Sequence, residues 1–309
     1  MTSNKIIEIT PIVDSLSINF SIFCYNYLMK DSNIYKTNII SRDEYGRPSG
    51  IVAINKPIDV TSHDLVNRIR KQLDIRKVGH AGALDVFADG VMIYLIGKAT
   101  KLSDKLMHFD KEYITTIILG IATDTQDTEG EITEIKTGYL IKDIKNIKPT
   151  LNKFIGKQKQ YVSVYSSVKV EGKKLRILMR DKNYEKQITY DQDNHKQLNL
   201  VQINKDSRPK SFSLKIPAKD ITIHNIELLE SGDLPIKKMT KLSKKLSSLT
   251  ETQKFPYIKV KVNSSKGTYI RQLAEDIGSQ LNMPAMLLAL TRTKVGDISI
   301  NDCIKITDL

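Results

Sequence analysis

The order of apolar segments is the sequence feature that most constrains how this chain can fold. Apolar runs of strand length recur along the chain, and several of them return through a short polar turn instead of through a helix. Residues 112–132 are the clearest case, because β-branched residues stand on both sides of an acidic turn. Hairpins outnumber strand–helix–strand crossovers, which favours an α+β fold over a doubly wound parallel sheet.

Local patterns predict the other elements. Apolar runs predict strands over 50–57 and 90–97, and Pro57 ends the first because it cannot donate to a ladder. Residues 60–74 predict a helix that begins at a Thr/Ser cap. The remaining expectations are helices over 141–155 and 236–249, a strand over 221–230, and a strand–turn–helix unit over 257–281.

Periodicity also predicts the domain organisation. Residues 1–48 lack a sustained apolar period, and we expect an N-terminal extension of unknown role. Residues 49–309 are expected to form a single domain. A segment at about 180–220, rich in Asn, Asp, Gln and Lys, reads as a polar and partly mobile insertion.

The charge and the cysteines narrow the class of protein. The net charge of +13 and the pI near 9.4 favour a polyanionic partner, with nucleic acid ahead of a membrane surface. A simple solubility surplus of lysine is the alternative. Cys24 and Cys303 stand in no CxxC or Cys/His cluster, which is typical of a reducing cytosolic compartment. No apolar run reaches the roughly 20 residues of a spanning helix, and no leader pattern stands at the start.

Several common catalytic motifs are missing from the sequence. There is no GxxxxGK[ST], GxGxxG, HExxH or GxSxG. The acids of residues 124–131 lack the spacing of a calcium loop, and we expect a polar hairpin turn there, with no metal site.

Residues 77–91, KVGHAGALDVFADGV, place a single carboxylate, Asp85, in a run of small residues. Small residues let a large ligand such as a flipped base or a sugar-phosphate approach the backbone. The alternative is an ordinary tight turn whose acid caps a helix or strand. The small residues concerned are Gly79, Ala81, Gly82, Ala83 and Gly90.

Two further stretches carry candidate functional side chains. Residues 264–278 place Arg271 at a turn that enters a helix, where it could pair with a buried acid or form a surface salt bridge. Tyr113 lies in a predicted strand, where its ring could face a cleft or the core.

Taken in order, the stretches resemble the TruB-type tRNA pseudouridine synthases. The similarity spans roughly residues 49–300 apart from the polar insertion. It rests on GIVAINKPIDVTSHDLVNRIRK, KVGHAGALDVFADGVMIYLIGKATKLS, KEYITTIILGIATDTQDTEGEI, VYSSVKVEGKKL, KGTYIRQLAEDIG and LLALTRTKVGDI.

The resemblance implies a fold and a reaction. The fold is the pseudouridine synthase fold, an α+β fold with an extended, mixed, mostly antiparallel sheet flanked by helices and an RNA-binding cleft. The reaction flips uridine 55 out of the tRNA T-loop, cleaves its glycosidic bond, turns the uracil and rejoins it through carbon. It implies no cofactor and no metal, a cytoplasmic monomer, and tRNA as the partner.

The resemblance also implies residue roles. Asp85 matches the catalytic aspartate, either as nucleophile or as the group that removes a sugar proton. Arg271 matches the arginine that pairs with this acid. Tyr113 matches the ring that stacks on the target base and is a candidate for removing the proton from carbon 5. The implied substrate-binding set comprises Leu290 in the uracil pocket, Tyr269 beneath the site, His80, Lys56 and Lys101 at the RNA, and Asp127 in the active-site network.

The chain departs from the family pattern at several points. The usual GHTGTLDP reads GHAGALDV, so Ala81 and Ala83 replace threonines and Val86 replaces a proline. Gln160 and Tyr165 keep their places while two prolines between them are lost. A catalytically weak or inactive tRNA-binding protein therefore stays an alternative, as does a glycosidase that releases the base. The short remainder after LTRT predicts no appended C-terminal RNA-binding domain.

Overall fold

The computed structural model describes residues 40–42, 45–193, 195–203 and 211–305, so what the sequence predicts for residues 1–39 lies outside the described residues. The chain divides into two compact units, which are described separately. Unit 1 consists of residues 1–115, 261–266 and 289–309, and unit 2 consists of residues 116–260 and 267–288.

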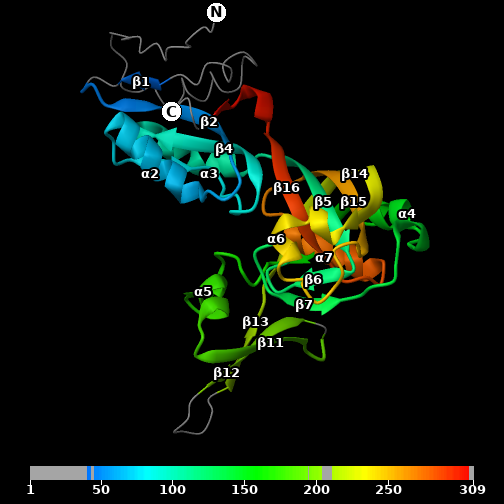
Figure 1. The fold of residues 1–309 in the computed structure, drawn as a ribbon. Coiled ribbons are helices and arrows are strands. Elements are labelled where there is room, and N and C mark those ends of the chain that lie inside the picture. The colour runs from blue at the N-terminus through cyan, green and yellow to red at the C-terminus, as the bar shows by residue number, and fades with distance from the viewer. Residues whose placement is uncertain (1–39, 43–44, 194, 204–210, 306–309) are drawn as a thin grey trace, which may run out of the picture. The chain divides into compact units, whose positions relative to one another are not determined.

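One large mixed sheet dominates the architecture (Figure 1), and the predicted α+β class is confirmed. Antiparallel pairs such as β2–β4 and β8–β14 occur beside the parallel pair β4–β16. In sheet order the strands are β1 (Ile40–Arg42), β2 (Pro48–Lys56), β4 (Asp89–Ile96), β16 (Ala285–Val295), β5 (Lys111–Leu119), β15 (Lys254–Ser264), β14 (Ala218–Pro235) and β8 (Gly156–Tyr161). Three short strands pair at its margins: β3 (Val78–His80), β17 (Ile298–Ser299) and β18 (Ile304–Lys305).

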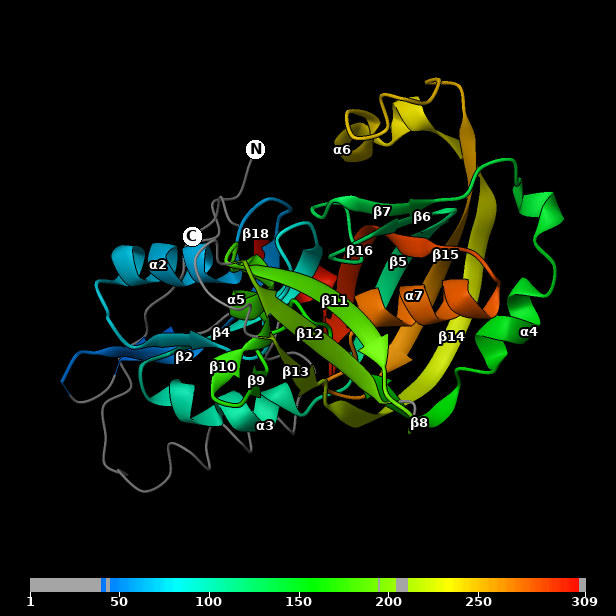
Figure 2. The same cartoon turned by 90° about the horizontal axis from the view of Figure 1, so that it is seen from below.

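Unit 1 packs helices on both faces of strands β2 and β4. Helix α2 (Ser62–Leu73) begins at a capping box formed by Thr61 and Asp64, as the sequence predicts, and its Leu65, Val66 and Ile69 are buried. The 3-10 helix η2 (Gly97–Leu102) and helix α3 (Ser103–Met107) bury apolar side chains against the opposite face (Figure 2). Because both faces are covered, β4 is a continuous apolar run instead of an alternating one. The 3-10 helix η5 (Ile300–Asp302) lies near the C-terminus.

Unit 2 contains helix α7 (Ile270–Gln280), the hairpin of β6 (Ile121–Thr123) and β7 (Ile132–Ile135), and two apolar clusters. The first cluster includes Ile118, Phe255 and Met286. The second joins helix α5 (Leu175–Arg180) to a separate three-stranded sheet. The predicted strand, acidic turn and return strand over 112–132 are present as β5, β6 and β7, with the return strand beginning only at Ile132, and the strand–turn–helix over 257–281 is present as well.

Two predicted helices are much shorter than the sequence suggests. Over 141–155 the chain forms the 3-10 helix η3 (Ile141–Asp143) and helix α4 (Ile147–Asn152), because Asn146 adopts a left-handed conformation with φ of 63° between them. Over 236–249 it forms the 3-10 helix η4 (Ile236–Lys238), the single turn α6 (Thr240–Ser243) and further turns. The predicted apolar side chains Met239, Leu242 and Leu246 are nevertheless buried.

The polar segment at about 180–220 contains a sheet that the sequence did not predict. Strands β11 (Tyr184–Tyr190), β12 (Lys196–Gln202) and β13 (Ser211–Lys215) pair antiparallel in that order (Figure 2). One face carries Leu198, Leu200 and Leu214 into the second apolar cluster, which is why a polar composition still gives a packed sheet. A two-stranded hairpin of β9 (Lys169–Val170) and β10 (Lys173–Lys174) precedes α5.

Candidate functional site

The turn that carries Asp85 joins β3 to β4 in unit 1. Asp85 is partly exposed, whereas the neighbouring Leu84 and Phe87 are buried. The backbone of the turn is closed by a hydrogen bond from the Ala88 amide to the Asp85 carbonyl at 3.2 Å. The local structure therefore presents the carboxylate from a short loop whose apolar neighbours anchor it in the core.

The positions of this stretch hold small residues for different structural reasons. Gly90 has a φ of +111°, and a Cβ there would lie 2.2 Å from the Arg292 carbonyl oxygen, so glycine is required by a neighbouring strand. Ala81 is fully buried. By contrast, a Cβ at Gly82 would meet nothing within 4 Å, and Ala83 is exposed. Space beside the backbone is therefore left at Gly82 and Ala83, and at Gly79, where a Cβ would meet Thr100 at 3.9 Å, but not along the whole stretch as the sequence suggested.

Buried cations and a buried hydroxyl hold the backbone of the turn. The Ser62 hydroxyl accepts from the Leu84 amide at 3.0 Å and donates to the Leu84 carbonyl at 3.1 Å. The Lys56 ammonium donates to the Val86 carbonyl at 3.4 Å. The Arg292 guanidinium donates to the Gly82 and Ala83 carbonyls, each at 3.4 Å. None of these contacts uses a side chain of residues 81, 83 or 86.

Lys56 has a different place from the one predicted. The resemblance puts it at the RNA backbone, but its side chain has no exposed surface and its ammonium also donates to the Pro57 and Val60 carbonyls at 2.8 Å. Burial lowers the pKa of Lys56 to about 8, against the attraction of Asp89, Asp85 and Asp59. Lys56 is thus corrected from an RNA contact to a group that holds the loop.

Sequence reasoning missed two buried cations in unit 1. Arg292 is 2% exposed and, besides the turn, donates to the Val91 carbonyl at 2.7 Å. Lys111 donates to the Met107 and Phe109 carbonyls at 2.6 and 2.5 Å, which ties the end of α3 to β5 two residues before Tyr113. Arg292 stands in the motif LTRT and Lys111 in KEYITT, and their place in these motifs was the sequence signal that could have identified them. Burial lowers the pKa of Lys111 to about 8.

The predicted base-contacting residues Tyr113 and Leu290 lie on neighbouring strands of unit 1. Tyr113 in β5 is 8% exposed and Leu290 in β16 is 5% exposed. The Thr115 hydroxyl, on the same face of β5 as Tyr113, donates to the Ala289 carbonyl at 2.7 Å. The side chains of Tyr113 and Leu290 are therefore buried on inner strands of the sheet instead of lying at its edge.

His80 and Lys101 occupy different environments. Within the described residues the His80 Nδ1 atom is buried and has no hydrogen-bond partner. Burial, followed by the nearby Arg292 and His63, lowers the pKa of His80, which favours its neutral form. Lys101 in η2 is exposed, so it stays available for a phosphate.

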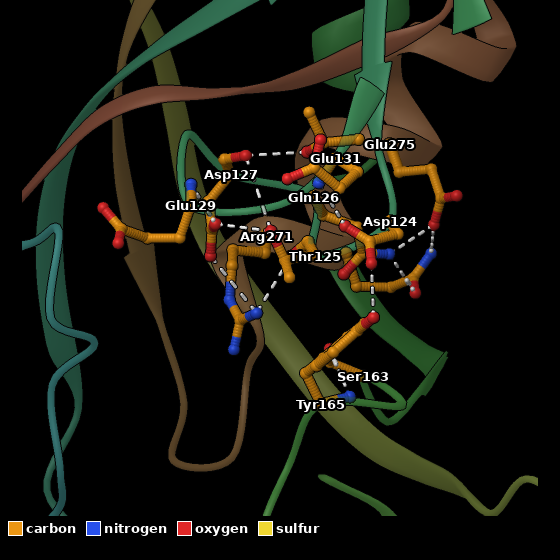
Figure 3. Close-up of polar contacts among 12 residues, drawn as sticks. Asp124, Thr125, Gln126, Asp127, Glu129, Glu131, Ser163, Tyr165, Arg271 and Glu275 are labelled. Carbon is orange, nitrogen blue, oxygen red and sulfur yellow. Dashed lines mark hydrogen bonds and ion pairs between the residues drawn. The ribbon is translucent and has the colours of Figure 1, made fainter. Parts of the chain in front are cut away.

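In unit 2 the structure brings Arg271 and Asp127 together (Figure 3). Arg271 is the second residue of α7, and its Nη1 atom lies 2.9 Å from the Thr125 carbonyl oxygen and 3.3 Å from Asp127 Oδ2. The Asp127 Oδ1 atom accepts from the Thr125 hydroxyl at 2.6 Å and from the Glu129 amide at 3.0 Å. Asp85 belongs to the other unit, and its pairing with Arg271 stays a prediction.

Gln160 fixes the backbone that leads into α7. Its side-chain amide donates to the Tyr269 carbonyl at 3.0 Å and accepts from the Tyr269 amide at 2.8 Å. The Gln160 side chain therefore satisfies both backbone groups of Tyr269, as a neighbouring strand would. The Tyr269 ring packs against the apolar cluster that includes Leu175 and Leu214. Tyr165 donates to Asp124 at 2.5 Å, and burial, followed by this bond, raises the pKa of Tyr165.

In the described part of the chain, one group of three potential metal ligands occurs, Asp191, Asp193 and His195, and the Asp191 carboxylate already accepts from the Asp193 and His195 amides. The described helices include none that is long and apolar enough to span a bilayer.

Comparison with known proteins identifies the class of enzyme. Residues 70–218 match the family model described as TruB family pseudouridylate synthase (N terminal domain). The fold agrees with one chain of the crystal structure of a Cbf5-Nop10-Gar1 complex, with a TM-score of 0.50 and 22% identity over 84% of this chain and 53% of that chain. The family-model match, together with the relatives named next, shows the class to be that of the pseudouridylate synthases, which are isomerases.

Curated relatives narrow the class to a family. The chain is 34% identical over 269 residues to tRNA pseudouridine synthase B of Desulfotalea psychrophila, covering 86% of this chain and 90% of that protein. It is also 34% identical over 263 residues to the protein of that name from Phocaeicola vulgatus, covering 83% and 89%. The chain belongs to the TruB family of pseudouridylate synthases.

Proposed function

We propose that this protein converts uridine 55 in the T-loop of tRNA to pseudouridine. The observation that carries the proposal is the 34% identity to a tRNA pseudouridine synthase B across 90% of that relative's length. The net charge of +13 suits a tRNA partner. We further propose that the enzyme acts as a monomer in the cytoplasm, where tRNA is processed.

The chemistry we propose is a redox-neutral isomerisation on a flipped nucleotide. The bond between N1 and C1′ breaks, the uracil turns, and a bond forms between C5 and C1′. The proton on C5 is lost, and N1 gains one. Atoms and electrons balance without a cofactor, so the steps need a carboxylate at the ribose, a base near C5 and walls that hold the free uracil.

Residues of unit 1 supply these groups in our proposal. Asp85 acts at the ribose, either by attacking it or by removing a sugar proton. Tyr113 stacks on the base and removes the C5 proton, while Leu290 forms the apolar wall. The partial exposure of Asp85 and the near-complete burial of the two apolar groups support this division of roles.

RNA contacts complete the proposal for unit 1. His80 contacts the RNA at the vacated stack as a neutral ring, which its lowered pKa and its unpartnered Nδ1 atom support. Lys101 contacts a phosphate, which its exposure supports.

Unit 2 supplies Arg271 as the partner of the Asp85 carboxylate, with Tyr269 packed beneath the site. The Asp127 carboxylate holds the arginine in place, as the 3.3 Å ion pair supports. A planar guanidinium can bind the turn through one N–H edge and present another N–H edge to a second carboxylate, which an ammonium does less well.

The test is carbodiimide mapping of an unmodified tRNA transcript after incubation with the wild-type protein or with Asp85→Asn. We expect one new reverse-transcription stop, at the nucleotide directly 3′ of position 55, with the wild-type protein alone. Equal stops with both proteins, or none with either, would refute the proposal. A transcript with cytidine at that position serves as the matched control.

A further inference from the structure

A buried polar network lies behind Arg271 and joins three separate segments of unit 2. Gln272, the neighbour of Arg271 on α7, is 4% exposed, and its amide group donates to Glu275 and Asp276, each at 2.8 Å. Spacings of three and four residues put these side chains on one face of the helix. The network therefore begins one residue from the proposed catalytic arginine.

The turn that holds Arg271 belongs to the same network. Gln126, which adopts a left-handed conformation with φ of 65°, donates to Gln272 at 3.0 Å and to Glu275 at 2.5 Å. Its neighbours Thr125 and Asp127 are the residues that bind Arg271. Figure 3 shows Arg271 on one side of this turn and Glu275 on the other. Helix α7 thus binds three consecutive turn residues from two sides: Arg271 binds Thr125 and Asp127, and the Gln272 and Glu275 side chains bind Gln126.

The third segment is the three-stranded sheet, which supplies a buried cation. Lys196, at the start of β12, is 6% exposed, and its Nζ atom lies 3.4 Å from Gln272 Oε1 and 3.7 Å from Glu275 Oε2. Its side chain leaves the same face as Leu198 and Leu200, so packing fixes its direction. Among the described ion pairs it is the cation that faces Glu275.

The network should respond most strongly to loss of the positive charge of Lys196. Two carboxylates, Glu275 and Asp276, stand together, and burial raises the pKa of Asp276 to about 6, while Lys196 favours its ionised form. Without the lysine the repulsion between these two acids would lose the cation that offsets it. Glu275 is an acceptor for both Gln126 and Gln272, so its displacement would release the turn.

We propose that Lys196 is a positioning residue for the isomerisation, acting through Gln272 and Glu275 on the turn that orients Arg271. The inference rests on the proposed function for its catalytic consequence. Lys196 does not touch substrate; it fixes the arginine through the network, and it makes the three-stranded sheet part of the catalytic apparatus of this chain.

The test compares Lys196→Met and Lys196→Arg with Lys215→Met, which removes an exposed lysine from the same sheet. We expect Lys196→Met to lower kcat on a tRNA transcript at least about tenfold, while the Kd for tRNA changes less than about twofold. Lys196→Arg should restore most of kcat, and Lys215→Met should leave it unchanged. Unchanged kcat in Lys196→Met, equal losses in both methionine variants, or no recovery with arginine would overturn the proposal. If Lys196→Met does not fold, Lys196→Gln takes its place with the same criteria.

Hydrogen exchange separates this proposal from the proposed function. The Leu287 amide donates to the Gln126 carbonyl at 3.0 Å, so its exchange reports how firmly the turn is held. Lys196→Met should speed exchange at Leu287, and Lys215→Met should not. If the wild-type protein makes no pseudouridine, the proposed function fails, and this exchange difference still decides whether Lys196 holds the turn. Exchange that is unchanged in Lys196→Met would show that it does not.

Discussion

The two turns that carry the candidate catalytic groups are stabilised in different ways. In unit 1, the Asp85 turn is held through its backbone, by Ser62, Lys56 and Arg292. In unit 2, the turn that holds Arg271 is bound at the Thr125 and Gln126 carbonyls and depends in addition on side chains of its own, since those of Thr125, Gln126 and Asp127 each make a specific contact. A backbone-held loop tolerates changes of side chain, whereas a side-chain network does not.

This contrast explains how the chain departs from its family. Ala81, Ala83 and Val86 replace residues that the family usually has, and all three lie in the backbone-held turn. Arg271 and Asp127, which the resemblance places in the site, both belong to the side-chain network. We therefore expect substitutions to have large effects in unit 2 and at glycines of unit 1, and small effects at the exposed positions of the Asp85 turn.

The largest effect is expected at Arg271. Arg271→Lys keeps the positive charge but loses the planar fork, whose Nη1 atom contacts both the Thr125 carbonyl and the Asp127 carboxylate. We predict a fall in the single-turnover rate of about 100-fold with little change in tRNA affinity. Arg180→Lys, at an exposed arginine at the end of α5, is the control and should be neutral. Equal rates for the wild-type protein and Arg271→Lys would contradict the role of the fork.

The next effect concerns the stability of unit 1. Gly90→Ala places a Cβ 2.2 Å from a backbone oxygen at a φ of +111°, and we predict a loss of about 3 kcal/mol in the free energy of unfolding. Gly82→Ala has a similar φ of +93° but open space, and should lose about 1 kcal/mol. Urea titration of both variants measures the difference. Equal losses would show that conformation alone, and not the contact with Arg292, requires glycine at position 90.

The buried Lys56 predicts a dependence of stability on pH. Burial lowers its pKa from 10.5 to about 8 in the folded state. Between these values the unfolded chain binds more protons, so the contribution of Lys56 to stability rises as the pH increases from about 8 to 10.5. The unfolding free energy of the wild-type protein should therefore increase relative to that of Lys56→Met over this range. A difference between the two proteins that stays constant with pH would contradict the lowered pKa.

The smallest effect is expected where the family residues are restored. Ala83 is exposed and Val86 is 37% exposed, and neither side chain takes part in the contacts that hold the turn. The double variant Ala83→Thr/Val86→Pro should change kcat less than about threefold, because the loop is already fixed through its backbone. An increase of tenfold or more would show that the side chains of this turn limit catalysis in the wild-type protein.

The sequence predicted the elements whose signals are local. The cap at Thr61, the apolar run of β4 and the strand–turn–helix before α7 were all readable because neighbouring residues determine them. Over 236–249 the apolar positions were predicted correctly but the helix was not, since turns can bury the same spacing of side chains.

Contacts between distant segments could not be predicted. Gly90 is required by Arg292 on another strand, and one of the three carbonyls that bind Lys56, that of Val86, lies 30 residues away. Lys196 lies in a segment whose polar composition suggested a partly mobile insertion, yet its side chain is buried and lies near Gln272, 76 residues further on. In each case at least one partner lies far along the chain, and the local sequence does not identify it.

The most direct test of the central claim is release of tritium from a tRNA transcript labelled at C5 of uridine, followed in a single turnover with excess enzyme. Formation of the bond between C5 and C1′ must release the C5 hydrogen, whereas hydrolysis alone would release the whole base. We predict one tritium released per tRNA, with the RNA strand intact and no free uracil. Release of no tritium from the RNA, or free labelled uracil in solution, would contradict the claim that this chain is an isomerase of uridine in tRNA.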